Sequence, residues 1–225
     1  MKDLYFEVVT NSGSSNIKLS VDNLYIAGFA GRDIEKTMKH IEELVKLGVS
    51  RPDSIPTYYI NGTNLLVQDN EIQVVGNGSS GEVEFIILQH DGELYIGIGS
   101  DHTDRDLETV DVPKAKQVCP KPIGSTLWKY SEVKEHWDEL IMESWQIIDG
   151  TKVLYQSGTA KDLLSLESLI DGARSTIPTN LENILLFSGT VATVNGIKPG
   201  SHFFGKITDK FFGRSLEFDY GIKVI

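Results

Sequence analysis

Three acidic side chains have the types and the spacing to hold one divalent cation: Glu82, Glu84 and Asp101. They lie on two apolar segments that are joined by Asp91-Gly92. This dipeptide favours the two-residue turn of a β-hairpin, because both of its positions accept positive φ. A hairpin with that turn places Glu82 opposite Asp101. Since side chains alternate between the faces of a strand, all three carboxylates are predicted to emerge on one face, at one end of the hairpin.

Carboxylates with Cβ atoms roughly 5–7 Å apart repel one another. Water can separate them, a proton can neutralise one, or a cation can lie between them. Oxygen-only ligands suit hard cations such as Mg²⁺, Mn²⁺ or Ca²⁺. Gly97 and Gly99 lie on the same face and are predicted to leave room above the sheet.

A solvated acidic sheet edge is the alternative to a metal site. Residues 85–88 and 94–98 are apolar on both faces, however, so this sheet is expected to be covered. Buried carboxylates need a partner, which favours the metal site.

The composition indicates a globular protein with an acidic excess. A chain of 225 residues is long enough for one large domain with a sizeable core. Its net charge of -11 argues against nucleic acids and anionic membranes as partners, since both bind to positive surfaces. The one cysteine, Cys119, excludes an internal disulfide and suits a reducing compartment. Neither a long apolar span nor a signal pattern is found, so we expect a cytoplasmic protein.

The elements that position the acidic residues are predicted from periodicity and turn residues. Apolar residues at helical spacing predict a helix over 32–47 that ends at Gly48. Two more helices are predicted over 131–145 and 159–173. Residues 110–124 are rich in Pro and Lys and predict a long loop, with lysines that are either solvated or directed at an anionic ligand.

Short segments bounded by Gly, Asn and Pro predict strands for most of the remaining chain. We therefore expect a single α+β domain over residues 1–225, dominated by mixed or antiparallel sheet and with a few peripheral helices. N-terminal strands are expected within 1–25, and the core within 26–225.

The order of these features resembles the fumarylacetoacetate hydrolase superfamily, over residues from about 26 to 220. Glu82-Val83-Glu84 is similar to the E-x-E strand motif of that family, and residues 100–106 (SDHTDRD) are similar to its N-D-x-[ST]-x-R-D stretch. The resemblance implies that Glu82, Glu84 and Asp101 bind Mg²⁺ or Mn²⁺. It also implies a fumarylacetoacetate hydrolase-like fold.

The same resemblance implies further site residues. His40 and Glu43 are similar to the family's H-x-x-E, which implies that His40, oriented by Glu43, activates a water molecule or shuttles a proton. From the residues alone, this pair could equally be a solvent-facing pair on a helix. Lys116 is implied as a catalytic cation, and Arg105 as a residue that holds the metal loop. Residues implied to bind substrate are Gln156, Gly189 and Thr190.

The chain departs from the family pattern where the substrate is bound. Ala30 and Gly31 stand in place of the usual Asn-Tyr before the histidine, and Asn61 stands where a lysine is expected. The reaction of any one characterised member is therefore not carried over.

The resemblance implies a small 2-oxo acid or 1,3-dicarbonyl compound as substrate. Two of its oxygens can chelate the cation, which then acts as a Lewis acid. A hydrolase or lyase would cleave an acylpyruvate-like C–C bond through a metal-bound enolate. Decarboxylation, hydration or isomerisation of a related oxo acid is one alternative, and non-catalytic, metal-dependent binding of a small molecule is another. A homodimer is implied as well.

Overall fold

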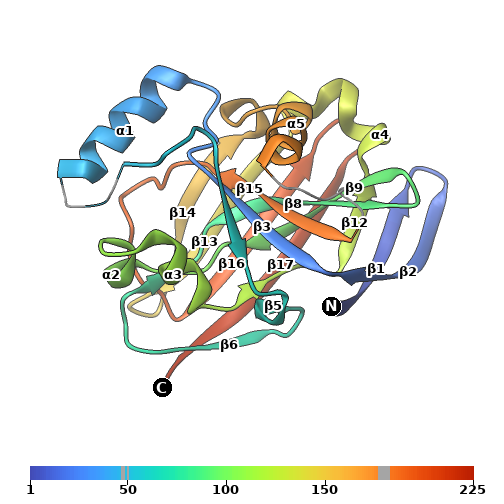
Figure 1. The fold of residues 1–225 in the computed structure, drawn as a ribbon. Coiled ribbons are helices and arrows are strands. Elements are labelled where there is room, and N and C mark those ends of the chain that lie inside the picture. The colour runs from blue at the N-terminus through green and yellow to red at the C-terminus, as the bar shows by residue number, and fades with distance from the viewer. Residues whose placement is uncertain (47–48, 50, 177–182) are drawn as a thin grey trace.

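Two β-sheets form the body of the chain in the computed structural model, which describes residues 1–46, 49, 51–176 and 183–225 (Figure 1). The larger sheet has eight strands, in the spatial order β2 (Gly13–Val21), β1 (Lys2–Thr10), β12 (Thr126–Lys129), β9 (Glu93–Ser100), β8 (Val83–His90), β15 (Ile184–Thr190), β3 (Asn23–Gly28) and β4 (Thr57–Asn61). The second sheet has five, in the order β14 (Thr151–Thr159), β13 (Ile141–Ile148), β16 (His202–Asp209), β17 (Arg214–Val224) and β6 (Glu71–Val74).

Two short strand pairs and the helices complete the described elements. The strand pairs are β7 (Ser79–Ser80) with β10 (Thr103–Asp104), and β5 (Leu66–Val67) with β11 (Lys121–Pro122). The α-helices are α1 (Ile34–Lys46), α2 (Arg105–Glu108), α3 (Val112–Gln117), α4 (Tyr130–Val133) and α5 (Leu166–Thr176), and the 3₁₀-helices are η1 (Thr63–Leu65), η2 (Lys134–Glu139) and η3 (Ala160–Asp162).

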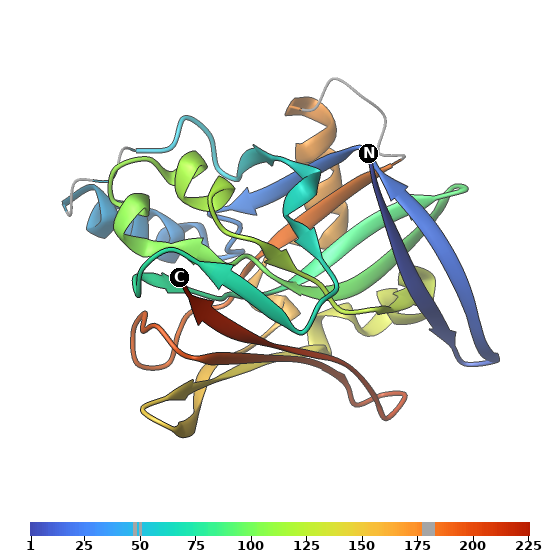
Figure 2. The ribbon, with the colours of Figure 1, turned by 90° about the horizontal axis from the view of Figure 1, so that it is seen from below.

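Most strand pairs are antiparallel, but β1 with β12, β11 with β5, β15 with β3 and β17 with β6 are parallel. The mixed, strand-rich α+β class predicted from the sequence is thus confirmed. Figure 2 shows the β1–β2 hairpin projecting at one side of the molecule. Both strands belong to the eight-stranded sheet, so residues 2–21 extend the core sheet. Within the described residues, no helix has the length and apolar character needed to cross a membrane.

Strand β8 shows how the eight-stranded sheet is covered on both faces. Val83, Phe85 and Ile87 are buried in a core that includes residues of the five-stranded sheet and α5. Ile86 and Leu88 alternate with them and are buried in a second core on the opposite face. The covered sheet expected from the sequence is confirmed, and a carboxylate on either face of β8 has little access to water.

The β8–β9 hairpin has the predicted register. Asp91 and Gly92 have φ values of 51° and 75°, as the tight hairpin turn requires. Glu84 pairs with Gly99, and the Asp101 amide donates to the Glu82 carbonyl oxygen over 3.0 Å. The turn at Asp91-Gly92 therefore brings Glu82 and Asp101, the two ends of a 20-residue stretch, next to each other.

Helix α1 forms where a helix was predicted. It runs from Ile34 to Lys46 and buries Ile41 at 1% exposure. The predicted end at Gly48 lies outside the described residues. Figure 1 shows α1 at the periphery of the molecule.

The predicted helix over 131–145 is wrong beyond Glu139. From Ile141 the chain enters β13, and Met142, Ser144 and Gln146 are buried at every second position. Hydrogen-bonded neighbours on both sides, β14 and β16, fix this segment as a central strand. Its helical pattern is overridden by these tertiary contacts.

The predicted loop over 110–124 is also partly wrong, because α3 forms within it. The Asp111 carboxylate caps this helix by accepting from the Lys114 amide over 3.0 Å, and Pro113 lies in its first turn. Helix α3 buries Lys116, which makes this lysine a part of the interior.

Candidate metal centre

Glu82, Glu84 and Asp101 come together as the hairpin register predicts. Glu82 directly precedes β8, Glu84 is its second residue, and Asp101 directly follows β9. Each offers a carboxylate oxygen, and these oxygens lie within 4.8 Å of one another. Two oxygens on opposite sides of one ion are about 4.2 Å apart around Mg²⁺ and about 5 Å apart around Ca²⁺. The oxygen-only donor set and its span therefore fit one hard divalent cation.

The electrostatics of the two glutamates favour such a cation. Glu84 is 2% exposed, and burial raises its pKa well above the usual value, with further increases from Asp101 and Glu82. Burial also raises the pKa of Glu82, against the opposing effect of Arg105. A bound cation would offset the cost of ionising both groups.

Asp101 is neutralised from within the protein by two lysines. The Lys116 ammonium group bonds to Asp101 Oδ2, and Lys121 Nζ lies 3.0 Å from Asp101 Oδ1. Burial alone would raise the pKa of Asp101, but the two ammonium groups outweigh it and hold that pKa below its usual range. The pKa of Lys116 is raised, since Asp101 and Glu82 outweigh the effect of burial. Asp101 is therefore ionised and fixed in orientation.

Lys121 was missed by the sequence analysis. Its side chain is fully buried, and its ammonium group also donates to the His102 carbonyl oxygen. Burial lowers its pKa, as does the Lys116 charge, while Asp101 raises it. A lysine between two prolines indicates an exposed loop, so nothing local reveals this partnership.

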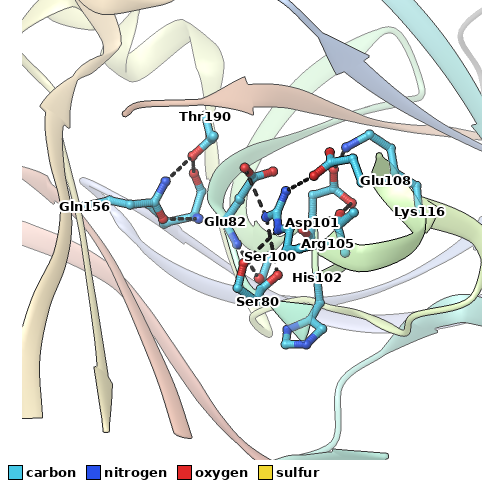
Figure 3. Close-up of polar contacts among 12 residues, drawn as sticks. Ser80, Glu82, Ser100, Asp101, His102, Arg105, Glu108, Lys116, Gln156 and Thr190 are labelled. Atoms are coloured by element: carbon cyan, nitrogen blue, oxygen red, sulfur yellow. Dashed lines mark hydrogen bonds and ion pairs between the residues drawn. The ribbon is translucent and has the colours of Figure 1, made fainter. Parts of the chain in front are cut away.

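Arg105 links the segment that follows Asp101 to Glu82. One guanidinium nitrogen lies 3.1 Å from Glu82 Oε1, another lies 2.9 Å from Glu108 Oε2, and Nε donates to Ser80 Oγ over 2.8 Å (Figure 3). Asp104 caps the short helix α2, which begins at Arg105, by accepting from the Leu107 amide. The guanidinium group thus orients Glu82 and holds the segment that follows Asp101.

Gln156 holds the E-x-E strand through its side-chain amide. Its Oε1 accepts from the Val83 amide over 2.9 Å and from Ser144 Oγ over 2.8 Å. Its Nε2 donates to Thr190 Oγ1 over 2.7 Å (Figure 3). The same nitrogen donates to the Val191 carbonyl oxygen over 2.8 Å. All four hydrogen-bonding positions of the amide are used within the protein, and a role of Gln156 in substrate binding stays a prediction.

Gly189 and Thr190 act on the same strand. The Gly189 amide donates to Glu84 Oε2 over 2.8 Å, and Thr190 Oγ1 donates to the Val83 carbonyl oxygen over 2.6 Å. In this structure the three residues expected to bind substrate hold strand β8, which carries Glu84, in place.

The room expected above Gly97 and Gly99 is filled by apolar side chains. A Cβ atom at Gly97 would lie 2.7 Å from Leu127, and one at Gly99 would lie 2.8 Å from Phe187. That part of the prediction is wrong. These glycines let the second core pack closely against the hairpin.

His40 and Glu43 lie away from these contacts. Both are exposed on α1, and within the described part of the chain no hydrogen bond or ion pair joins either of them to the three carboxylates. Their catalytic role stays a prediction.

The positions that depart from the family pattern make structural contacts. The Ala30 carbonyl oxygen accepts from the Leu164 amide over 2.8 Å, and Gly31 pairs with Leu163. The Asn61 side chain donates to Gln117, the residue after Lys116, over 3.3 Å. These contacts tie the start of the α1 segment to the chain before α5, and β4 to α3.

A buried polar chain runs behind Asp101. His102 is fully buried, and its ring nitrogens bond to Ser79 Oγ at 2.9 Å and to Tyr220 Oη at 3.0 Å. Tyr220 Oη in turn bonds to Ser100 Oγ, which accepts from the Glu82 amide. Burial lowers the pKa of His102 to about 3, and the charges of Lys121 and Arg105 lower it further.

One protein family matches most of the chain: residues 27–220 match the family described as "Protein of unknown function (DUF2848)". No curated protein sequence matches the chain.

Solved structures share its fold. Cg1458 with an inhibitor is 15% identical, with a TM-score of 0.67 over 95% of this chain and 81% of that one. The 2-keto-3-deoxy-D-arabinonate dehydratase complexed with magnesium and 2,5-dioxopentanoate is 17% identical, with a TM-score of 0.65 over 96% of this chain and 78% of that one. Yeast ynq8, a fumarylacetoacetate hydrolase family protein, is 14% identical, with a TM-score of 0.62 over 91% and 94%. The predicted fumarylacetoacetate hydrolase-like fold is confirmed.

Lys121→Met should destabilise the protein, because it removes one charge of a fully buried ion pair. Breaking such a pair costs about 3–5 kcal/mol, and the remaining Lys116 contact places the expected loss near the lower value. Urea denaturation without added metal measures it. Lys114→Met is the matched control: this lysine is 74% exposed and pairs with Asp111, so its loss should cost less than about 1 kcal/mol. Equal effects of the two substitutions would contradict the assignment.

The pKa of His102 predicts a loss of stability in acid. The unfolded chain takes up a proton near pH 6.5, whereas the folded chain resists it down to about pH 3. The contribution of a neutral His102 is therefore fully present above pH 6.5 and falls by about 1.4 kcal/mol per pH unit below it. Urea denaturation from pH 7 to pH 4 should show a shallower loss for His102→Asn than for wild type. His90→Asn, at the exposed hairpin tip, should follow wild type, and parallel curves for wild type and His102→Asn would refute the prediction.

Proposed function

We propose that this chain, which belongs to the DUF2848 family of proteins of unknown function, is a divalent-metal-dependent enzyme that acts on a small 2-oxo acid or 1,3-dicarbonyl compound. The observation that carries the proposal is the cluster of Glu82, Glu84 and Asp101, whose carboxylate oxygens lie within 4.8 Å of one another. A fold shared with a magnesium-bound dehydratase supports it.

The charges around the cluster support an acidic ligand. Four carboxylates, those of Glu82, Glu84, Asp101 and Glu108, lie in one network of ion pairs and electrostatic contacts with three side-chain cations, Arg105, Lys116 and Lys121. With all of them ionised, the network has one net negative charge. A divalent cation changes this to one net positive charge, which a singly charged oxo acid would neutralise.

Each residue of the site then has a role. Glu82, Glu84 and Asp101 would hold Mg²⁺ or Mn²⁺, which supplies Lewis-acid polarisation of a carbonyl group when bound. The Lys116 ammonium group, held at Asp101, would donate to a ligand carboxylate or to developing negative charge on oxygen. Arg105 keeps Glu82 oriented, and Gln156, Gly189 and Thr190 keep the ligand strand in place.

His40 is proposed as the group that takes a proton from water, oriented by Glu43 one turn further along α1. Both are exposed on a peripheral helix, so α1 must approach the carboxylates for this role. Hydrolytic cleavage of an acylpyruvate-like C–C bond needs such a base, because water has to be activated.

A second candidate reaction is dehydration, decarboxylation or isomerisation of a related oxo acid. The shared fold of the 2-keto-3-deoxy-D-arabinonate dehydratase favours it. A panel assay with Mg²⁺ or Mn²⁺ separates the candidates: cleavage of an acylpyruvate supports the hydrolase, and turnover of oxaloacetate or of a hydroxylated oxo acid without such cleavage supports the second candidate. If no compound turns over but oxalate raises the melting temperature when Mn²⁺ is present, the protein is a binding protein.

Glu84→Gln should abolish tight Mn²⁺ binding, measured by titration calorimetry. The amide keeps the shape of the side chain but removes the charge that the cation needs. We expect a loss of more than about 100-fold, beyond the roughly 10–100-fold caused by losing an outer contact. Glu217→Gln is the control, since that glutamate pairs with Lys206 on the five-stranded sheet at 2.7 Å and should bind Mn²⁺ as wild type does. An unchanged affinity of Glu84→Gln would refute the ligand assignment.

His40→Ala should separate chemistry from metal binding. We expect Mn²⁺ affinity within about twofold of wild type, because His40 makes no contact with the described carboxylates, and a turnover number lower by about 10²–10⁴-fold, the usual contribution of a general base. Steady-state kinetics on whichever substrate the panel identifies provides the measurement. Lys39→Ala, at an exposed neighbour on the same helix, should retain wild-type turnover. Full activity of His40→Ala would mean that another group activates water.

A further inference from the structure

Two buried polar side chains of the five-stranded sheet have no hydrogen-bond partner in the described part of the chain. Tyr155 is 3% exposed and its hydroxyl group is unpaired, and Gln146 is fully buried with both amide atoms unpaired. Buried polar groups in folded proteins are nearly always paired, so each of these two needs a specific explanation. A missing partner that comes from a ligand is one such explanation.

The two side chains are buried on adjacent strands of the five-stranded sheet. Gln146 follows Ser144 by two residues on β13 and is buried on the same face. Ser144 pairs with Gln156 on β14, and Tyr155 lies at the register shift directly beside that pair. Both unpaired groups therefore lie next to the Ser144–Gln156 link that holds Val83 of the metal-ligand strand.

Several groups of the metal centre influence the pKa of the Tyr155 hydroxyl group. Burial raises its pKa, and the Ser80 hydroxyl and the Arg105 guanidinium lie close enough to lower it. The Glu82 carboxylate raises it. Ser80 and Arg105 are joined to each other over 2.8 Å, and Arg105 pairs with Glu82. Tyr155, a residue of the five-stranded sheet, thus lies near this network.

One segment, residues 191–201, borders both unpaired groups. It begins directly after Thr190, and its Val194 amide donates to the Tyr155 carbonyl oxygen over 2.8 Å. The Lys198 backbone lies near enough to the Tyr155 hydroxyl group to lower its pKa. Further along, a Cβ atom at Gly200 would collide with Gln146 Oε1. The same short segment therefore runs past the hydroxyl group and the amide.

We infer that Tyr155 and Gln146 form a subsite beside the metal centre that binds a hydroxyl group on the part of the oxo acid farther from the cation. The inference rests on the proposed function, which places the 2-oxo acid end of the ligand at the three carboxylates.

The chemistry of the subsite selects a hydroxyl group over the alternatives. Both side chains are neutral and can donate and accept, as a hydroxyl group does. A second carboxylate is less suited to this buried pair, because Arg105 is held by Glu82 and Glu108 and Lys116 is held by Asp101, while Lys198 of the bordering segment is exposed. An apolar tail would leave the hydroxyl and the amide unpaired, and sites built to bond a hydroxyl group strongly reject ligands without one.

Titration calorimetry on the Mn²⁺-loaded protein tests the inference with matched ligands. The probes are oxalate, 2-oxobutyrate with 4-hydroxy-2-oxobutyrate, and 2-oxopentanoate with 5-hydroxy-2-oxopentanoate. In wild type, at least one hydroxylated acid should bind about tenfold or more tightly than its unsubstituted counterpart. In Tyr155→Phe this ratio should fall to about one to twofold, while the oxalate affinity stays within about twofold of wild type. Gln146→Leu provides a second variant with the same expected result.

Tyr130→Phe is the matched control, because it removes the hydroxyl group of another buried tyrosine, whose partner is Glu167 Oε1 at 2.8 Å. It should keep the wild-type ratio. A hydroxyl preference that is absent from wild type, or is unchanged in both Tyr155→Phe and Gln146→Leu, would overturn the inference, as would an equal loss of oxalate affinity, which indicates a structural role. Wild-type protein that binds Mn²⁺ but no oxalate would contradict the proposed function, and the subsite with it.

Discussion

Repulsion among three carboxylates at the end of one hairpin is the constraint that the surrounding structure must satisfy. Asp101 is fully buried and Glu84 nearly so, and Glu82 is held beside them. The cations that balance them, Arg105, Lys116 and Lys121, all lie within 20 residues after Asp101. Because the segments between the acidic residues and these cations are short, little conformational entropy is lost when the ion pairs close them into loops. The helices α2 and α3 are best understood as the supports that carry two of these cations.

The second requirement is that strand β8, which carries Glu84, cannot shift along its neighbours. Val83 is bonded through its amide to Gln156 and through its carbonyl oxygen to Thr190, while Glu84 is bonded to the Gly189 amide. Gln156 belongs to the five-stranded sheet and Val83 to the eight-stranded sheet. The site therefore lies where the two sheets are joined by side-chain hydrogen bonds. A fully satisfied buried network of this kind favours one arrangement of its members.

Local signals predicted the parts of the site that depend on local geometry. The Asp91-Gly92 turn and the two-residue period of a strand suffice to group the three carboxylates, because both act over a few residues. Lys121 was missed because it lies 20 residues after Asp101, with α2 and α3 between them. The contact between the two side chains therefore depends on how this intervening segment folds, which no local pattern shows. The segment from Ile141 to Trp145 fits a helical pattern, and its strand form depends on β14 and β16, which come later in the chain. The filled space above Gly99 likewise depends on Phe187 from a distant strand.

Two glutamines on one sheet face show how structural amides and ligand-directed amides can be told apart. Gln156 and Gln146 are both fully buried, on adjacent strands of the five-stranded sheet. All four positions of the Gln156 amide bond to protein groups, which explains its burial in terms of structure alone. The Gln146 amide bonds to none of the described residues, although it lies in the same interior. Burial imposes the same desolvation cost on both amides. Hydrogen bonds within the protein offset this cost for Gln156, whereas for Gln146 we infer that a ligand supplies the hydrogen bonds.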